Sequence, residues 1–348
     1  MKAVILAGGE GTRLRPLTEK RPKPLMPVAG KWCVDYVLNS LVSAGFKEII
    51  ITTGYLSDKL IKTIGSGAKH NASILYSFED VPAGTAGAVK KVLPYLEENV
   101  IVASGDVLAD VNLSEIYAYH AEKKADVTMA LTRVENPSEF GIVGLNEEGR
   151  IIRFLEKPKP EQVFSNLINA GIYVLKKDVL KYVPDDKPFD FSKNLFPILL
   201  EKGYRMYGKV ISGTWLDVGR PLDLLKANLI MTEKKFGGQF ISENAFLGEN
   251  VYLQNPVYID TGTKIMSGCR VENACVYDGV NVEENCTLEG ALILHGVRIG
   301  KGSKIKNSIL SDKCVVEENA VVEDSIIGEN VIIKKNSVLK GAMIAGIY

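Results

Sequence analysis

The chain carries a glycine-rich run with two cations close behind it. Residues 8–14 read GGEGTRL, and Lys23 lies between two prolines in the run RPKPL at residues 21–25. Glycines let the backbone approach an anion and present successive N–H groups to it. Arg13 and Lys23 add positive charge, and the prolines limit the freedom that Lys23 would lose on binding. Although the run is not a Walker A loop and each piece alone could be a turn with solvated basic residues, together they favour a triphosphate cradle.

Two aspartates beside glycines are candidate ligands for a shared hard cation. Asp106 follows Ser104 and Gly105, and Asp217 lies far downstream in the run WLDVG. Mg²⁺ favours one or two carboxylates, with substrate phosphates and waters completing its octahedron. A single Asp after a strand is more often a helix cap or a turn former. The sequence therefore predicts a magnesium site on the condition that the fold brings the two aspartates together.

A carboxylate, a lysine and an amide lie close to apolar segments further along the chain. Residues 156–158 read EKP, and residues 169–173 read NAGIY. A carboxylate and an amide can hold sugar hydroxyls, whereas a sugar phosphate needs a cation. Glu156, Lys157 and Asn169 are therefore candidates for binding a phosphorylated sugar. A surface ion pair is the alternative explanation of the first two.

The elements that must position these residues alternate between strand-like and helix-like segments over residues 1–235. The strand-like runs are rich in β-branched residues and cover residues 2–7, 49–53, 74–78, 100–104 and 127–132. A helical pattern of apolar residues spans residues 34–42 and stops at a glycine. This alternation predicts an open α/β domain with a parallel sheet, which binds ligands beyond the carboxyl ends of its strands. The loops after Ala7, Phe78 and Ser104 are therefore the expected site.

From residue 237 the pattern changes to a hexad repeat. A helix opened by Pro221 is expected to end at Gly237 and Gly238, so the domain boundary is placed between residues 236 and 237. Beyond it, aliphatic residues recur every six positions, with one-residue slips and a second small or apolar residue four positions after each. This pattern is typical of a stacked β-solenoid, in which the slips fit short corners.

Cysteine and histidine usage argues for buried thiols rather than for metal or redox chemistry. Four of the five cysteines fall on the second inward position of the repeat: Cys269, Cys275, Cys286 and Cys314. We expect them to be small buried hydrophobes. Since there is no CxxC pair and there are three histidines, neither a disulfide framework nor a zinc site is expected. His295, at a repeat junction, is expected to be a polar corner residue rather than an acyltransferase catalyst.

Composition limits the classes of partner. Lys plus Arg and Asp plus Glu each number 42, so the formal net charge is zero. A nucleic-acid backbone requires a surplus of Lys and Arg, and nucleic acid is therefore not an expected partner. No stretch approaches the roughly 20 apolar residues that span a bilayer, and the N-terminus lacks the pattern of a signal peptide. We expect a cytoplasmic protein with no membrane partner.

Taken in order, the motifs resemble those of the sugar-1-phosphate nucleotidylyltransferases, also called nucleotide-sugar pyrophosphorylases. The chain has GGxGTRL with a following PKPL, a strand-ending GD, EKP, NAGIY and WLDVG, and its hexads resemble the hexapeptide left-handed β-helix that often follows this catalytic domain. The resemblance implies a Rossmann-like open, mostly parallel sheet in residues 1–236, followed by a left-handed parallel β-helix in residues 237–348. Arg220 departs from the family, which often has Thr there, at the rim of the expected metal site.

The resemblance also implies a chemistry. The phosphate oxygen of a sugar 1-phosphate would attack the α-phosphorus of a nucleoside triphosphate in a magnesium-dependent, in-line transfer, and pyrophosphate would leave. Because this nucleophile is already anionic, no general base is required. Catalysis would consist of positioning and charge neutralisation.

Roles for individual residues follow from the same resemblance. Arg13 and Lys23 would neutralise the β- and γ-phosphates, Asp106 and Asp217 would hold Mg²⁺ against the α-phosphate, and Lys157 would hold the sugar phosphate. The other nucleotide-binding positions would be Leu6, Gly8, Gly9, Gly11, Thr12, Glu79, Gly84, Thr85 and Gly105. The sugar itself would be fixed by Gly141, Glu156, Asn169 and Gly171.

The prediction of the base rests on Glu79 and on the run GTAG at residues 84–87. With these residues the chain most resembles the branch of the family that transfers guanylyl groups to mannose 1-phosphate. A carboxylate suits guanine, which offers two neighbouring donors, N1–H and the 2-amino group. GTP is therefore the favoured nucleotide and GDP-mannose the expected product. Thymidylyl, uridylyl or adenylyl transfer to a glucose-type phosphate is the alternative. A non-catalytic regulatory or sensor paralogue is less favoured, because the cations and carboxylates are all present.

The open coils at the ends of a solenoid need covering. We therefore expect a homo-oligomer, a dimer or a tetramer, that uses the repeat domain. Truncation from about Gly237 onward is expected to leave a soluble catalytic domain with altered assembly or stability.

Overall fold

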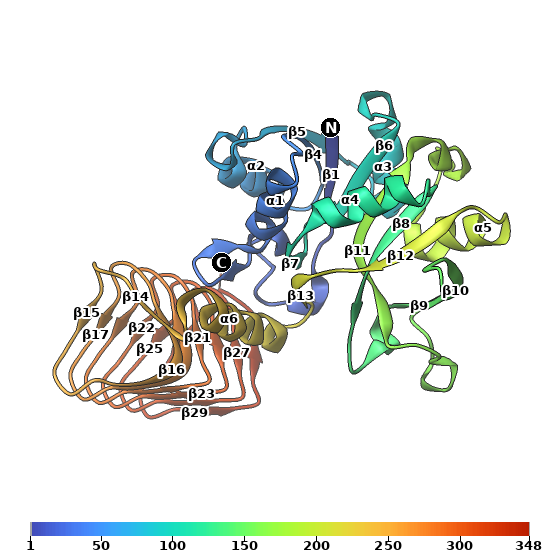
Figure 1. Ribbon diagram of the computed structural model, residues 1–348. Coiled ribbons are helices and arrows are strands. Elements are labelled where there is room, and N and C mark those ends of the chain that lie inside the picture. The colour runs from blue at the N-terminus through green and yellow to red at the C-terminus, as the bar shows by residue number, and fades with distance from the viewer. Residues whose placement is uncertain (1, 348) are drawn as a thin grey trace. The chain divides into compact units, whose positions relative to one another are not determined.

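The computed structural model describes residues 2–347, which form two compact units (Figure 1). The first contains the chain up to Gly9 together with Cys33–Asp217. The second contains Glu10–Trp32 and the chain from Val218 onward. The second unit thus contains the segment with Arg13 and Lys23 and the helix before the repeat, in addition to the repeat itself. The boundary predicted from the sequence lies instead between residues 236 and 237.

Four parallel strands form one half of the sheet in the first unit, with β5 at its edge. Their order is β5-β4-β1-β6, with bounds β1 (Lys2–Ala7), β4 (Glu48–Thr53), β5 (Ser73–Phe78) and β6 (Asn99–Ser104). Each agrees within one residue with a predicted apolar run, which confirms those predictions. Val4, Ile5 and Ile101 have no solvent exposure, as expected of strands covered on both faces.

Antiparallel strands extend this sheet beyond β6. The long strand β11 pairs antiparallel with β6 and with β8, β12 runs parallel to β8, and β9 and β10 pair antiparallel beside them. The bounds are β8 (Val127–Arg133), β9 (Gly141–Leu145), β10 (Ile151–Glu156), β11 (Leu167–Lys176) and β12 (Met206–Val210). The predicted Rossmann-like open sheet is confirmed, with an antiparallel half added.

The helices of the first unit follow from apolar periodicity. Helix α1 (Cys33–Ser43) confirms the pattern expected at residues 34–42: Val34, Val37 and Leu38 are fully buried, and the turn after the helix reaches a left-handed φ of 88° at Gly45. The others are α2 (Ser57–Ile64), α3 (Gly84–Lys91), α4 (Leu113–Glu122) and α5 (Phe196–Glu201).

A two-stranded antiparallel ribbon returns the chain to the end of β6. It pairs β7 (Val107–Val111) with β13 (Gly213–Asp217). Ser40 of α1 fixes the ribbon, since its hydroxyl donates to the Ala109 carbonyl at 3.0 Å and accepts from the Val111 N–H at 3.1 Å. Strand β7 follows β6 almost at once, so β13 is delivered beside the loop between them.

Helix α6 (Pro221–Phe236) opens the part of the second unit that precedes the repeat. Pro221 occupies the first turn, the Arg220 N–H donates to the Asp223 carboxylate at 2.9 Å, and Gly237 ends the helix with φ 63°. The predicted start and stop of this helix are both confirmed. Two short strands, β2 (Pro27–Val28) and β3 (Lys31–Trp32), form a hairpin in the same unit.

The repeat folds as the predicted parallel β-helix, drawn in orange to red in Figure 1. Partner residues in successive coils are 17 apart over most of its length, as in Arg270, Thr287 and Lys304, with a longer step of 18 from Tyr252 to Arg270. The 17-residue coil accounts for the one-residue slips in the hexads. Its strands are β14 (Gln239–Ile241), β15 (Phe246–Leu247), β16 (Tyr252–Ile259), β17 (Lys264–Ile265), β18 (Arg270–Val276), β19 (Asn281–Val282), β20 (Thr287–Glu289), β21 (Leu292–Ile293), β22 (Arg298–Ile299), β23 (Lys304–Lys306), β24 (Ile309–Leu310), β25 (Val315–Val316), β26 (Val321–Glu323), β27 (Ile326–Ile327), β28 (Ile332–Ile333), β29 (Val338–Lys340) and β30 (Met343–Ile344).

All five cysteines are buried, as predicted for the four in the repeat. Cys269, Cys286 and Cys314 belong to the interior core of the coils. Cys275 does not: its neighbours Ala274 and Val276 take the interior positions, and its thiol lies 3.8 Å from the Thr232 hydroxyl of α6. The predicted inward register was wrong at Cys275 because helix α6 covers that face of the coil and buries the thiol from outside.

None of the helices within residues 2–347 is both long enough and apolar enough to cross a membrane.

Candidate functional site

The switch point of the central sheet lies between β1 and β6. Leu6 and Ser104 are register partners, and the Gly105 N–H donates to the Leu6 carbonyl at 2.8 Å. A Cβ at Gly105 would lie 2.8 Å from the Ile5 side chain, so glycine is required for this close approach. The loop carrying Gly8 and Gly9 and the loop carrying Gly105 and Asp106 therefore leave adjacent parallel strands at the same edge.

Glu79 follows β5 and points its carboxylate at the first of these loops. Its N–H continues the strand by donating to the Thr53 carbonyl at 2.9 Å, and a Cβ at Gly8 would lie 3.3 Å from Glu79 Oε2. The side chain is 9% exposed, and Lys91 Nζ lies 3.8 Å from Oε1, an atom that has no hydrogen-bond partner among the described residues. Burial raises the pKa of Glu79, against the lowering effects of Lys91 and of the Ala83 N–H.

The predicted nucleotide residues Gly84 and Thr85 open helix α3. Gly84 has φ 75°, and a Cβ there would lie 2.6 Å from the Phe189 nitrogen, so the position requires glycine. The Thr85 N–H donates to Asp190 Oδ1 at 3.1 Å. The start of α3 is thus fixed by the segment around residues 189–190, for which no role was predicted.

The two predicted metal ligands are brought close together by the ribbon. Asp217, the last residue of β13, is the register partner of Val107, which follows Asp106 directly. The Ser104 hydroxyl donates to Asp106 Oδ1 at 2.6 Å, which orients that carboxylate. Two hard carboxylate ligands at one end of a ribbon fit a divalent cation whose other ligands are phosphates and waters. In the described chain, no group of three or more His, Cys, Asp or Glu residues forms a metal site.

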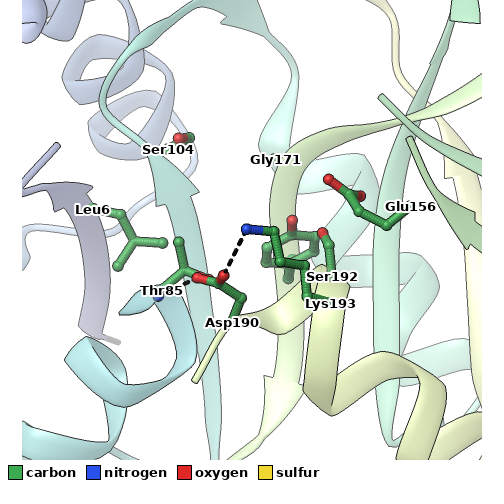
Figure 2. A pocket seen from close by; sticks show the side chains of 9 residues that line it. Leu6, Thr85, Ser104, Glu156, Gly171, Asp190, Ser192 and Lys193 are labelled. Atoms are coloured by element: carbon green, nitrogen blue, oxygen red, sulfur yellow. Dashed lines mark hydrogen bonds and ion pairs between the residues drawn. The ribbon is translucent and has the colours of Figure 1, made fainter. Parts of the chain in front are cut away.

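A polar pocket of about 210 Å³ lies in the first unit (Figure 2). It is lined by four of the predicted site residues, namely Leu6, Thr85, Glu156 and Gly171. It is also lined by five residues that sequence reasoning did not assign: Ser104, Tyr173, Asp190, Ser192 and Lys193. Figure 2 shows the Lys193 ammonium paired with Asp190, at 3.5 Å, and Glu156 reaching in from the other side.

Glu156 and Gly141 form a matched pair across the β9–β10 ladder. They are register partners, and a Cβ at Gly141 would lie 2.7 Å from Glu156 Oε2, so the glycine makes room for the carboxylate. Burial raises the pKa of Glu156, while Lys157 and Lys193 lower it. A desolvated carboxylate at a pocket wall is suited to accept hydrogen bonds from hydroxyl groups.

Asn169 stabilises the opposite wall of the pocket. Its amide oxygen accepts from the Gly171 N–H at 2.9 Å, and its amide nitrogen donates to the Tyr173 hydroxyl at 2.7 Å and the Ser192 hydroxyl at 3.0 Å. Gly171 has φ 73°, the left-handed conformation that this local turn needs. Asn169 therefore holds together three residues that line the pocket.

Lys157 lies next to Glu156 but does not line the pocket. Its side chain is exposed, and its backbone has φ 46°, an unusual conformation for a residue with a Cβ. The Lys157 N–H donates to the Phe140 carbonyl at 3.0 Å, which holds the turn. The ammonium is thus presented from a constrained backbone at the end of β10.

The remaining predicted nucleotide residues, Gly11, Thr12, Arg13 and Lys23, belong to the second unit. Gly11 has φ 63°, and its carbonyl accepts from the Thr18 hydroxyl at 2.9 Å. Lys23 is only 5% exposed, and a Cβ at Gly11 would lie 3.1 Å from the Lys23 Cβ. Arg13 lies on an exposed short helical turn, Thr12–Leu14. The glycine run and the lysine are therefore packed as one local structure.

Asp190, Ser192 and Lys193 were missed because the run FDFSK at residues 189–193 matches none of the motifs used to predict the site. The aromatic residues beside them are core, since Phe191 and Phe196 are buried and stack with ring centroids 5.6 Å apart. A charged pair between buried aromatic residues was the available signal.

A switch-point sheet with glycine loops, two neighbouring aspartates and a pocket beside them is a fold suited to binding a phosphorylated ligand. Residues 2–234 match the family model described as nucleotidyl transferase, and residues 236–339 match the one described as the EIF2B subunit epsilon LbH domain. The chain belongs to the nucleotidyl transferase family. Its C-terminal part is a hexapeptide-type β-helix.

Individual relatives are similar over about 65% of the chain. One is a mannose-1-phosphate guanylyltransferase from Mycobacterium tuberculosis, 36% identical over 65% of this chain and 63% of the relative. Another is a UTP–glucose-1-phosphate uridylyltransferase from Synechocystis, 33% identical over 65% of this chain and 62% of the relative. A third is the catalytic subunit beta of a Drosophila melanogaster mannose-1-phosphate guanylyltransferase, 36% identical over 64% and 61%. The chain thus spans a little over three fifths of the relatives it matches.

Proposed function

We propose that the protein transfers a nucleotidyl group from a nucleoside triphosphate to a sugar 1-phosphate and releases pyrophosphate. One observation carries this proposal. Two sets of predicted residues, Leu6 and Thr85 for the nucleotide and Glu156 and Gly171 for the sugar, line the same pocket. A transfer between two bound substrates requires such adjoining subsites.

The reaction joins an oxygen of the sugar phosphate to the α-phosphorus of the nucleotide. It breaks the bond between the α-phosphorus and the oxygen that bridges it to the β-phosphorus, and that oxygen leaves with the pyrophosphate. Asp106 and Asp217 would hold Mg²⁺, which when bound supplies charge neutralisation at the α-phosphate. Arg13 and Lys23 would neutralise the β- and γ-phosphates and so stabilise the leaving pyrophosphate. Since the attacking oxygen carries its own negative charge, the protein need only align the two phosphates and offset their repulsion.

The sugar would be held by the two walls of the pocket. Glu156 accepts hydrogen bonds from ring hydroxyls, and the network around Asn169 fixes the opposite wall. Lys157, which directly follows β10, would neutralise the sugar phosphate. The sugar epimer is then selected by which hydroxyls reach Glu156.

We further propose that the nucleotide is GTP and that the sugar is mannose 1-phosphate. Glu79 supports this choice, because a nearly buried carboxylate beside Gly8 with an unsatisfied Oε1 suits the two adjacent donors of guanine. Relatives named as mannose-1-phosphate guanylyltransferases support it as well. The relative named as a uridylyltransferase favours a second candidate, uridylyl transfer to glucose 1-phosphate.

A pyrophosphate-release panel tests these proposals. It crosses GTP, ATP, UTP and dTTP with the 1-phosphates of mannose, glucose, galactose and N-acetylglucosamine. We expect the highest kcat/KM for GTP with mannose 1-phosphate. Faster reaction with UTP or dTTP would overturn the proposal of guanylyl transfer and leave the proposal of nucleotidyl transfer standing. If no pair of substrates released more pyrophosphate than an Asp217→Asn control, the proposal of nucleotidyl transfer would be overturned.

We also propose a homo-oligomer, a dimer or a tetramer, formed through the β-helix, because its last coils leave apolar side chains exposed. Val338 is 71% exposed and Met343 is 67% exposed. Sedimentation as a monomer at micromolar concentration would contradict this proposal.

A further inference from the structure

Asn228 of helix α6 connects three parts of the second unit. It is fully buried. Its amide oxygen accepts from the Ala29 N–H at 3.0 Å and from the Tyr277 hydroxyl at 2.6 Å. Its amide nitrogen donates to the carbonyls of Pro27 and Leu224 at 2.9 and 3.0 Å. All the donors and acceptors of this side chain are thereby used to hold the β2–β3 hairpin and a β-helix coil to one helix.

One corner of the β-helix presents a stack of rings to the same hairpin. The centroids of Tyr258 and Tyr277 are 5.5 Å apart, those of Tyr277 and His295 are 5.4 Å apart, and Trp32 of the hairpin lies 6.1 Å beyond His295. His295 is paired with Asp278 through Nδ1, as expected of a structural corner residue. Any Cβ at Gly30 would collide with the Tyr258 hydroxyl, so the hairpin sits directly on the corner.

An ion pair fixes the other end of the same segment. Arg21 donates to Asp312 in a later coil, and both side chains are less than one-fifth exposed. The Arg21 guanidinium also lies 5.6 Å from the centre of the Trp32 ring. Lys23 follows two residues after Arg21 and four residues before Pro27, so it lies between two points of attachment.

We propose that the β-helix and α6 act as a positioning platform for the cation Lys23, with Asn228, Tyr277 and Asp312 as positioning residues. None of the three is in a predicted nucleotide motif, and each is about 200 residues or more from Lys23 in sequence. The backbone at Pro22 is extended, with ψ 145°, and Lys23 is buried. The attachments on both sides of Lys23 therefore constrain the backbone from which its side chain extends. This inference rests on the proposed role of Lys23 at the triphosphate.

The consequence is a division of labour between substrates. Every predicted sugar-binding residue lies in the first unit, whereas Arg13 and Lys23 lie in the second. Loosening the platform should therefore weaken the binding of the nucleoside triphosphate and leave the binding of the sugar 1-phosphate unaffected. A general loss of folding would weaken the binding of both substrates.

The test uses the full-length chain with two single variants. Tyr277→Phe keeps the ring stack and removes one hydrogen bond to Asn228, and Asp312→Asn removes the charge opposite Arg21. We expect each to raise the KM for GTP roughly five- to tenfold, with the KM for mannose 1-phosphate unchanged within about twofold. Arg21→Gln combined with Asp312→Asn should be no worse than Arg21→Gln alone, because both substitutions remove the same ion pair.

Glu329→Gln is the matched control, since Glu329 occupies the corner position of Asp312 one coil later. It should leave both KM values unchanged. The inference is overturned if both test variants keep the wild-type KM for GTP, or if they raise both KM values together.

Calorimetric binding of GTP with Mg²⁺ separates this inference from the proposed function. If the wild-type chain binds GTP but releases no pyrophosphate with any sugar, the proposed function fails. In that case the platform proposal still predicts that Tyr277→Phe and Asp312→Asn weaken GTP binding, and unchanged binding would overturn it. The two variants should also weaken the binding of inorganic triphosphate, which probes the cations without the base.

Discussion

The carboxylates of the pocket region and those of the β-helix differ in how their charge is satisfied. In the first unit, burial raises the pKa values of Glu79 and Glu156. In the β-helix, partly exposed glutamates pair with lysines 17 residues away in the next coil, as Glu289 does with Lys306 at 2.9 Å and Glu323 with Lys340 at 3.0 Å. Each coil therefore compensates its neighbour, whereas the site holds charge that nearby side chains do not fully compensate.

The hydroxyl groups inside the β-helix show the same contrast with Glu79. The hydroxyls of Ser303, Ser308 and Ser325 inside the β-helix donate to backbone carbonyls, so repetition satisfies them locally. Glu79 Oε1 near the switch point has no such partner among the described residues. A stacked repeat can satisfy many of its polar groups without a ligand, although Glu272 Oε1, His295 Nε2 and Asp312 Oδ1 in the repeat also have no hydrogen-bond partner among the described residues. The following experiments test this difference.

The largest effect should come from the metal ligands. Asp217→Asn is expected to lower kcat at saturating Mg²⁺ by at least about 10²-fold, because the carboxylate acts chiefly on transition-state charge. Its melting temperature should remain near that of the wild type. Asp110→Asn is the control, since Asp110 is an exposed residue on the same ribbon. A near-wild-type kcat for Asp217→Asn would remove the metal assignment.

Base selection should be the next most sensitive property. Glu79→Gln is expected to lose roughly tenfold or more in kcat/KM for GTP, because an amide cannot accept both guanine hydrogen bonds. Inosine triphosphate, which lacks the 2-amino group, should fall between GTP and ATP for the wild type. Asp80→Asn, at the exposed neighbouring position, should change neither. Equal losses for GTP and ATP in Glu79→Gln would show that the carboxylate does not read the base.

A smaller, pH-dependent effect is expected at Asp126, a structural carboxylate of the first unit. Burial would raise its pKa, but hydrogen bonds from Arg205 and Lys176 lower it to about 2. Because the folded-state pKa is depressed, the stabilisation is complete above the ordinary value of 3.8 and is lost as the pH falls toward 2. Asp126→Asn should cost about 1–2 kcal/mol in the free energy of unfolding near pH 7.

Urea unfolding at about pH 7 and about pH 3 measures this dependence. The difference between the wild type and Asp126→Asn should shrink at the lower pH. Asp178→Asn, at an exposed position, serves as the control. A difference that stays constant between the two pH values would mean that the effect is not electrostatic.

The smallest effect should be found on the β-helix surface. Lys306→Met removes the pair with Glu289, in which the side chains are 47% and 41% exposed. Exposed pairs are screened by water, so the free energy of unfolding should change by less than about 0.5 kcal/mol. A loss above about 1 kcal/mol would indicate that the ladder of charges acts as a cooperative network rather than as independent pairs.

Sequence reasoning was most successful where the pattern is local. Apolar runs predicted β1 and β4–β6 within one residue, because strand formation follows from β-branched composition and burial. The stops at Gly45 and Gly237 were predictable because both adopt a left-handed conformation that suits glycine. The β-helix was predictable because each coil repeats the same inward positions.

What the sequence by itself determined was therefore the list of elements, the repeat and the motifs at strand ends. Only the tertiary structure placed Asp217 opposite Val107, added Asp190 and Lys193 to the pocket and turned Cys275 toward α6. These outcomes depend on contacts between residues far apart in the chain, which no local pattern encodes. The same reason explains why residues 10–32 group with the β-helix: Asn228 and Asp312 attach them through single side chains whose role is visible only once the chain is folded.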